Sequence, residues 1–437
     1  MLVADTLDIL LPVLKCPICA NSTWRVEPGV GGAARVVCNR CQRAHRFERG
    51  VLWIDTLTVH EDVTTERRAV KPTENLPELG GWSEAYEGLE VTDNALREAY
   101  LALPYGNESS HFALPGYFAN VSRLAKEFEF IASQLPERGR LLDIGADGTW
   151  STARLASRGL TCIALDITDH LVLGDLYQTR YPRYARINVD MHENVFVEGS
   201  FDVITAFNAL HHSRRLNTVA ARIAAALKPG GTLGFFEPYV QSAEQREAFG
   251  APQTEVGISE NIHTIEEWHR AFDSLGLTLT SFATSDAFCA IYKKSVDTSR
   301  LDLLRTDADG CFIDYYQASL QATPDHAKVA IGQAPQLFRV QVTNNSHSAW
   351  ASRGPNAINL CYHVERLDGE LWTMVGFDNP RVPIDEFLMP GTSRTFDVPI
   401  ELVTAGTYRI EFDLVHESRT WFKDRGAQTA MVTCVVS

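Results

Sequence analysis

The stretch RLLDIGADGTWST, residues 140–152, constrains the fold of this chain more than any other. Its apolar residues Leu141, Leu142 and Ile144 indicate a buried strand, which breaks into a glycine turn and is followed by a helix. This order is typical of an open α/β sheet that binds a nucleotide-like ligand at the carboxyl ends of its strands. The turn is unusual because Asp147 stands where such loops mostly have glycine.

The acids of this turn constrain the ligand. A dinucleotide site needs the pattern Gly-x-Gly-x-x-Gly, whose bare backbone amides receive a pyrophosphate. Here only Gly145 is in register, and the carboxylates of Asp143 and Asp147 would repel a pyrophosphate. The turn therefore disfavours NAD and FAD. It favours a cationic ligand without phosphate, and S-adenosylmethionine (SAM), with a sulfonium and an ammonium group, fits that description.

Polar residues also follow the next strand-like stretches. TCIALDIT ends at Asp166, where an acid can accept both hydroxyls of a ribose. ARINVDMHE places Asp190 to reach an adenine amino group, and SFDVITAFNALHH ends near Asn208. The stretches AAALKPGGTLGFFEP, HTIEEWHRAFDSLGLTLTSF and AFCAIYKK predict the fifth, sixth and seventh strands.

Residues 105–295, with LHH and LKPGG in this order, resemble the class I SAM-dependent methyltransferases of the type 11 (UbiE-like) kind. The resemblance implies an α/β Rossmann-like fold, a seven-stranded sheet with helices on both faces. The family commonly has Gly-x-Gly where this chain has Asp147-Gly148-Thr149, and aspartate tolerates a positive φ better than most residues. The predicted cofactor-binding residues are Asp143, Gly145, Asp147, Gly148, Asp166, Asp190 and Asn208.

Two C-x2-C pairs near the amino terminus predict a metal site. Two such turns aim four thiolates at one tetrahedral ion, which is a closed structural Zn2+ site. A segment this short buries little core, so a metal would stabilise it. The segment resembles zinc ribbons that precede some methyltransferases, and we do not expect His45 to bind. The predicted ligands are Cys16, Cys19, Cys38 and Cys41.

Methyl transfer needs a general base only when the acceptor has a high pKa, such as a hydroxyl. His211 and His212 follow the fourth strand, at the ligand end of the sheet, and with His111 they are the catalytic candidates. For His211 and His212 the alternative is a role in supporting the loop near the cofactor, and for His111 it is a surface or packing role. Five further residues are candidates for facing the acceptor, with a surface or packing role as the alternative: Tyr105, Tyr117, Glu237, Tyr239 and His263.

We expect three domains: a zinc ribbon at 10–58, a methyltransferase domain at 59–295 with lid or substrate-wall helices at 59–135, and a β-sandwich at 313–437. The last has a period of two punctuated by turns, which is typical of an antiparallel β-sandwich. It resembles immunoglobulin-like modules of bacterial polysaccharide-assembly enzymes. This resemblance suggests an association with glycans, and oligomerisation through this domain is the alternative.

The net charge and the distribution of apolar residues disfavour some classes of function. The net charge of −15 disfavours nucleic acid as a partner. The first residues carry Asp5 and Asp8 and no basic stretch, and no run approaches a membrane span, so we expect a cytoplasmic protein. We expect a SAM-dependent methyltransferase acting on a sugar hydroxyl or related small metabolite in glycan synthesis. One alternative is an RNA base methyltransferase that docks through Arg40, Arg43, Arg46 and Arg49, and another is a non-catalytic scaffold.

Overall fold

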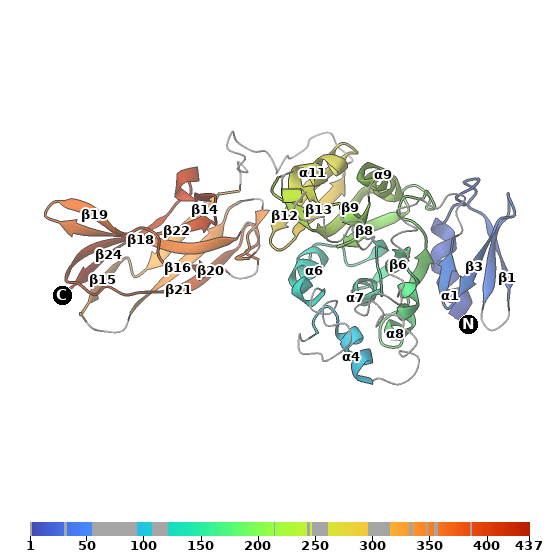
Figure 1. Ribbon diagram of the computed structural model, residues 1–437, viewed down its shortest axis with the longest axis horizontal. Helices are drawn as coiled ribbons and strands as arrows, with labels where there is room; N and C mark the ends of the chain where they lie inside the picture. Colours follow the sequence, from blue (N-terminus) through green and yellow to red (C-terminus); the bar gives the residue numbers. More distant parts are fainter. Residues whose placement is uncertain are drawn as a thin grey trace. The chain divides into compact units, whose positions relative to one another are not determined.

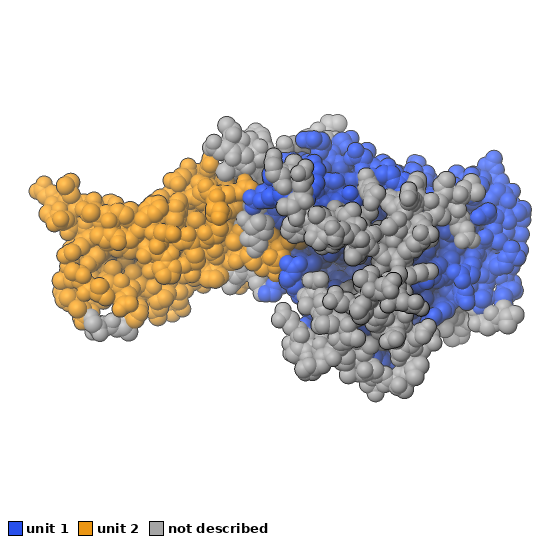
Figure 2. All heavy atoms as spheres, in the orientation of Figure 1, with its two compact units in different colours: residues 1–280, 289–301 blue, residues 281–288, 302–437 orange. Residues whose placement is uncertain are grey.

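The computed structural model divides the chain into two compact units (Figure 2). The amino-terminal unit comprises residues 1–280 and 289–301, and the carboxyl-terminal unit comprises 281–288 and 302–437. The structure describes residues 2–29, 33–54, 94–106, 121–213, 215–242, 245–246, 261–295, 315–331, 335–346, 348–353, 357–384 and 387–437.

The amino-terminal unit is built on the predicted methyltransferase sheet. Its strands lie in the order β7-β6-β5-β8-β9-β13-β12. The first strand, β5, lies at the topological switch point, because β6 and β7 are added on one side of it and β8 and β9 on the other. The pairs from β7 to β9 are parallel. Figure 1 shows α6, α7 and α8 on one side of this sheet and α9 and α11 on the other. The predicted fold class is confirmed.

The elements of this sheet follow the sequence pattern closely. The LKPGG turn is the one irregular place, because it lies inside β9 and shifts the register against β8. The strands are β5 (Gly139–Ile144), β6 (Leu160–Asp166), β7 (Ala185–Asn188), β8 (Phe201–Phe207), β9 (Leu227–Glu237), β12 (Leu277–Thr284) and β13 (Phe288–Lys294). The helices are α4 (Asn94–Ala102), α6 (Ala125–Ala132), α7 (Trp150–Ser157), α8 (Gly174–Tyr177), α9 (Leu216–Ala226) and α11 (Ile265–Asp273). The short elements are η2 (Asp169–Leu173), η3 (Leu210–His212), β10 (Tyr239–Val240) and β11 (His263–Thr264).

The cysteine-bearing segment continues the same sheet. Its antiparallel strands β1 to β4 follow one another in order, and β4 then pairs in parallel with β7, with Leu52 opposite Ile187. The segment therefore belongs to the same compact unit as the methyltransferase sheet. Its elements are α1 (Leu2–Leu10), η1 (Leu11–Val13), β1 (Trp24–Pro28), β2 (Ala34–Cys38), β3 (Ala44–Glu48) and β4 (Val51–Trp53).

The carboxyl-terminal unit consists of β-sheets, as the period of two predicts. One sheet has the order β14-β16-β21 and the other β15-β24-β22-β18-β19, with β20 on β18 and β23 on β22. Within these two sheets the pairs are antiparallel except for β15 with β24. Phe338 of β16 packs against Phe412 of β22, with ring centroids 5.8 Å apart, so the two sheets share a core.

The strands of this unit are β14 (Ala318–Thr323), β15 (His326–Val329), β16 (Gln336–Asn344), β17 (Ser348–Ala349), β18 (Ile358–Asp368), β19 (Leu371–Gly376), β20 (Val382–Pro383), β21 (Ser393–Ile400), β22 (Gly406–His416), β23 (Thr420–Trp421) and β24 (Ala430–Val436). A short 3-10 helix, η4 (Lys423–Arg425), lies between β23 and β24. Among the helices in the described parts of either unit, none is long and apolar enough to cross a membrane.

Candidate functional site

The turn after β5 approaches the loop after β8 very closely. Gly145 has φ +68°, and a Cβ added there would lie 2.2 Å from the Cβ of Ala209. Only glycine fits this position without displacing the neighbouring loop. Asp147 has φ +42°, the conformation for which an aspartate was expected to be tolerated, and Thr149 also lies in this region with φ +70°. Gly148 does not have a positive φ, and a Cβ there would meet Leu173 at 3.1 Å.

Asp143 lies at the centre of the sheet and is almost fully buried. Its carboxylate accepts hydrogen bonds from the hydroxyls of Ser151 (2.6 Å), Thr152 (2.6 Å) and Thr205 (2.8 Å). Burial raises the pKa of Asp143. These bonds join the end of β5 to the start of α7 and to β8, so this acid fixes the elements on both sides of the turn.

Asp166, at the end of β6, lies directly beside the turn. One carboxylate oxygen accepts the backbone N–H of Asp147 (2.8 Å), and the other accepts that of Thr168 (2.8 Å). Burial raises the pKa of Asp166, and so does the charge of Asp147. The carboxylate of Asp147 contacts the ring Nδ1 of His170, a residue that the sequence patterns did not indicate.

Asp190 follows β7 and belongs to a buried polar chain. Its carboxylate contacts both the backbone N–H and the ring Nδ1 of His192, whose Nε2 lies 2.7 Å from the hydroxyl of Ser213. Burial acts to raise the pKa of Asp190, but the hydrogen bonds and charge of His192 lower it overall. Asn208 follows β8 with φ +57° and an exposed side chain.

These residues form a set of carboxylates at the ends of three adjacent strands, β5, β6 and β7. The parallel pairing brings Asp147, Asp166 and Asp190 to the same edge of the sheet. Asp190 is also paired with Arg215 (3.8 Å), so one of the three charges is compensated. The carboxylates of Asp147 and Asp166 still suit a ligand that carries positive charge and no phosphate. The donor chemistry of the site is therefore compatible with SAM.

Glu237 and His211 form a buried pair at the carboxyl ends of β9 and β8. The ring Nδ1 of His211 lies 2.7 Å from a carboxylate oxygen of Glu237, and both side chains are almost fully buried. The same carboxylate accepts the backbone N–H groups of Ala209 (2.9 Å) and Leu210 (2.7 Å). Glu237 thus fixes both the loop and the orientation of the histidine. The ring centroid of His212 lies 4.0 Å from that of His211, with the two rings tilted by 39°.

A short strap lies next to this pair. β10 pairs in parallel with β11, which places Tyr239 opposite His263, and the backbone N–H of Asn261 donates to the carbonyl of His211 (2.8 Å). Burial lowers the pKa of His263. Its Nε2 and the side-chain nitrogen of Asn261 have no hydrogen-bond partner in the part of the chain that is described. Asn261 was not among the predicted residues, because its link to His211 runs through the backbone.

Of the remaining residues predicted to face the methyl acceptor, the structure describes Tyr105 but not His111 or Tyr117. Tyr105 is about half exposed, its hydroxyl hydrogen-bonds to Glu129, and the guanidinium of Arg154 lies 5.1 Å from its ring centroid. His111 and Tyr117, together with most of the expected wall at 59–135, lie outside the described residues.

The four predicted cysteines converge. Their sulfur atoms all lie within 4.8 Å of one another, with Cys16 and Cys41 3.5 Å apart and Cys19 and Cys38 3.6 Å apart. These separations are compatible with four thiolates around one zinc ion. Burial acts to raise the pKa of the Cys38 thiol. Hydrogen bonds from the backbone N–H groups of Cys41 and Arg40 outweigh this effect, so the pKa falls to about 6.

His45, the possible substitute ligand, lies elsewhere in the segment. It is buried, and its ring packs edge-on against Trp24, with centroids 5.9 Å apart. Among the described residues, the group that could hold a metal ion consists of the four cysteines.

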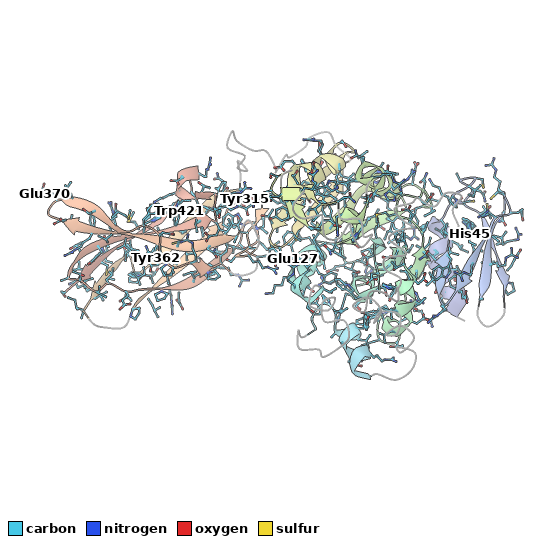
Figure 3. All side chains as sticks on the ribbon, viewed as in Figure 1. His45, Glu127, Tyr315, Tyr362, Glu370 and Trp421 are labelled. Atoms are coloured by element: carbon cyan, nitrogen blue, oxygen red, sulfur yellow. The ribbon has the colours of Figure 1, made fainter. Side chains whose placement is uncertain are left out.

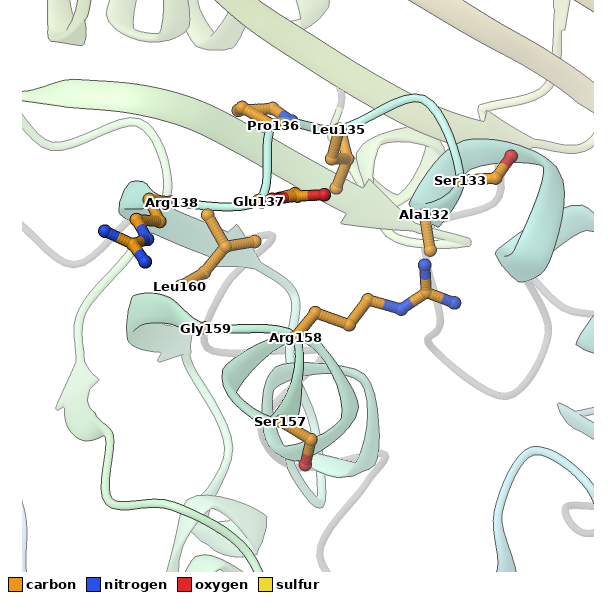
Figure 4. Close-up of a pocket in the computed structure, with 10 residues that line it drawn as sticks. All are labelled: Ala132, Ser133, Leu135, Pro136, Glu137, Arg138, Ser157, Arg158, Gly159 and Leu160. Atoms are coloured by element: carbon orange, nitrogen blue, oxygen red, sulfur yellow. The ribbon is translucent and has the colours of Figure 1, made fainter.

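A hollow of about 600 Å3 lies at the opposite end of the sheet (Figure 4). Its lining includes Arg138, just before β5 begins, and Gly159 and Leu160, where β6 begins. Because β5 and β6 are parallel, the hollow lies at their amino ends, away from Asp166. It is separate from the candidate site.

The strand order is that of a class I SAM-dependent methyltransferase domain. Residues 117–281 match the family model described as a methyltransferase domain. This match covers the sheet from β5 to the start of β12 and confirms the resemblance predicted from the sequence.

Two curated proteins share a similar stretch of about a quarter of this chain. The biotin biosynthesis bifunctional protein BioHC of Cellvibrio japonicus is 34% identical over 108 residues, which cover 24% of this chain and 21% of that protein. The ubiquinone biosynthesis O-methyltransferase of Xanthomonas axonopodis pv. citri is 29% identical over 109 residues, covering 24% of this chain and 46% of that protein. The chain thus spans less than half the length of either curated relative.

Among solved structures, a SAM-dependent methyltransferase from Methanosarcina mazei is 19% identical. The similar region covers 38% of this chain and 98% of that one, with a TM-score of 0.33.

Proposed function

We propose that this chain transfers a methyl group from SAM to a sugar hydroxyl, or to the hydroxyl of a related small metabolite, in glycan synthesis. The observation that carries the proposal is the buried pair of His211 and Glu237 beside the turn at Gly145. A histidine whose Nδ1–H is held by a carboxylate presents its other nitrogen as a base, as acceptors of high pKa require.

In this proposal the acids at the strand ends hold the cofactor. Asp166 binds the ribose hydroxyls, Asp190 the adenine amino group, and the turn containing Asp147 the methionine end. SAM supplies an electrophilic methyl group on a sulfonium. His211 would take the proton that the hydroxyl loses as its oxygen bonds to the methyl carbon, while the carbon–sulfur bond of SAM would break and S-adenosylhomocysteine would leave. Glu237 would stabilise the imidazolium that results.

The amino-terminal segment has a structural role in this proposal. Four thiolates occupy every position of a tetrahedral zinc ion, so the metal would stabilise the segment and leave no open position for catalysis. The alternative of RNA docking gains little support here, because Arg46 is paired with Glu48 (3.0 Å) and its charge is balanced locally.

Two measurements test the proposal. Calorimetry with SAM alone should show binding, and the absence of heat would favour the scaffold alternative. Transfer of labelled methyl from SAM should then be assayed on a panel of free sugars, glycosides and nucleotide sugars, with transfer RNA and ribosomal RNA in parallel. Labelling of RNA without labelling of any sugar would contradict the proposed substrate class.

His211→Ala tests the base. We expect turnover to fall by about 10²- to 10⁴-fold, with SAM affinity nearly unchanged, while the matched variant His212→Ala keeps most of the activity. Equal losses of turnover and SAM affinity in His211→Ala would instead indicate that this histidine supports the loop.

A further inference from the structure

Three buried side chains connect the ends of two strands that are not neighbours in the sheet. Asp190 and His192 follow β7, and Ser213 directly follows η3, which comes after β8. In the strand order, β6 and β5 lie between β7 and β8. Each of the three residues is at most 8% exposed, and we call them the Asp190 relay. The relay therefore joins loops on the two sides of the topological switch point, where open α/β sheets bind their ligands.

The hydrogen-bond partners define the direction of the relay. Burial acts to raise the pKa of Asp190, but His192 lowers it overall, so the carboxylate is ionised at neutral pH and only accepts hydrogen bonds. Its Oδ1 accepts from both the backbone N–H and the ring Nδ1–H of His192. At the other edge of a neutral ring, Nε2 accepts from the hydroxyl of Ser213 (2.7 Å). That oxygen accepts the backbone N–H of Arg215 (3.0 Å), so every donor in the relay points towards Asp190.

These bonds leave the second carboxylate oxygen of Asp190 for a ligand. His192 occupies Oδ1 twice, whereas Oδ2 lies 3.8 Å from Nη2 of Arg215. This is a contact between charges that is too long for a hydrogen bond. An ionised oxygen held in this way accepts from an amino group and repels a carbonyl oxygen, because the carbonyl would leave both groups without a donor.

We infer that His192 is a positioning residue that makes the site selective for the 6-amino group of adenine. The inference rests on the proposed contact between Asp190 and the adenine of SAM. The two donors of His192 oppose rotation of the carboxylate and keep it free of a proton, so Oδ2 can only accept. Without them the carboxyl group can turn, take up a proton and donate to a carbonyl oxygen at the same place. Selectivity for adenine over hypoxanthine is then lost.

Calorimetry of the full chain with S-adenosylhomocysteine and S-inosylhomocysteine tests the inference. The bases of these ligands differ at position 6, which carries an amino group in the first and an oxo group in the second, with a hydrogen on the adjacent N1. We expect the parent chain to bind S-adenosylhomocysteine about 10- to 100-fold more tightly, because only the amino group matches Oδ2. His192→Leu keeps an apolar side chain but no donor, and should reduce this ratio of affinities to about threefold or less.

Two control variants separate the donor of His192 from its packing. His192→Asn keeps an N–H group at the position of Nδ1, so it should retain most of the parent's ratio. His45→Leu makes the same substitution at another fully buried histidine of the same unit, in β3 (Figure 3), and should leave the ratio unchanged. Each ratio compares two ligands on one chain, so a general loss of stability cancels from it. If His192→Leu does not fold, His192→Ala removes the same donor with less steric demand.

The outcomes distinguish this inference from the proposals on which it depends. A parent ratio of about tenfold or more that the donor-free variants retain would overturn the inference alone. An equal loss of the ratio in His192→Asn and His192→Leu would attribute it to packing, which also overturns the inference. Equal binding of the two ligands by the parent would overturn the contact of Asp190 with adenine, and binding of neither would overturn the assignment of the cofactor site.

Discussion

Gly145→Ala should destabilise the methyltransferase domain for two reasons: alanine disfavours the left-handed backbone of this position, and its Cβ would clash with Ala209. The new Cβ would lie 2.2 Å from that of Ala209, whereas carbon atoms in contact are about 3.5–4.0 Å apart. The turn and the loop must therefore separate by more than about 1 Å. We expect a loss of about 1–2 kcal/mol from the left-handed backbone and a further loss of about 1–3 kcal/mol from overpacking.

Gly199→Ala separates these two contributions. Gly199 has φ +61°, close to the +68° of Gly145, but a Cβ there meets nothing within 4 Å. Its loss should therefore be limited to the backbone contribution of about 1–2 kcal/mol. Urea unfolding of both variants gives the difference in stability, and calorimetry gives the affinity for SAM.

The functional consequence follows from the position of Ala209, which immediately precedes η3 and its residue His211. Gly145→Ala should lower the affinity for SAM, and Gly199→Ala should leave it unchanged. The reasoning is wrong if the two variants lose equal stability, or if Gly145→Ala is destabilised yet binds SAM as the parent chain does.

Three further predictions concern other parts of the chain. Asp166→Ala should weaken SAM binding by about tenfold or more, measured by calorimetry, and an unchanged affinity would mean that this acid does not bind the ribose. Cys16→Ser should release metal and lower the thermal stability of the amino-terminal unit, and a metal content equal to the parent's would exclude the four-cysteine site. In the carboxyl-terminal unit, burial raises the pKa of Asp413 from 3.8 to about 7. The folded state then keeps a proton that the unfolded state loses between about pH 4 and pH 7, so Asp413 lowers stability progressively across that window. As the pH rises from about 4 to about 7, the free energy of unfolding of Asp413→Asn should therefore increase by up to about 4 kcal/mol relative to that of the parent chain. Urea series followed by hydrogen exchange of β22 would measure this gain, and a difference independent of pH would contradict it. Burial lowers the pKa of His416 to about 3, but this effect is common to both proteins and cancels in the comparison.

The sequence predicted the parts of the fold that depend on local pattern. The apolar stretches before Asp166, Asp190 and Asn208 became strands because each has four or more successive residues that the sheet buries on both faces. The left-handed turn at Asp147 was also foreseeable, because aspartate is one of the few residues that tolerate it.

The polar partners of the site were harder to predict. The contacts of Asp190 with His192 and of His211 with Glu237 depend on which side chains the fold brings together, and a single sequence gives no sign of that. Likewise, no periodicity indicated that β4 would pair with β7, because strand partners distant along the chain are selected by shape and edge availability.

The pairing of β4 with β7 has a consequence for solubility. Without it, β7 would end the sheet with a row of unpaired backbone groups, a surface on which another chain can add a strand. With it, the outermost strand on this side is β1, which carries Arg25 and Glu27 and ends in Pro28. Charges and a proline are typical of edges that resist strand addition. A chain shortened to begin after residue 58 should therefore aggregate edge to edge, even though every residue of the methyltransferase sheet remains.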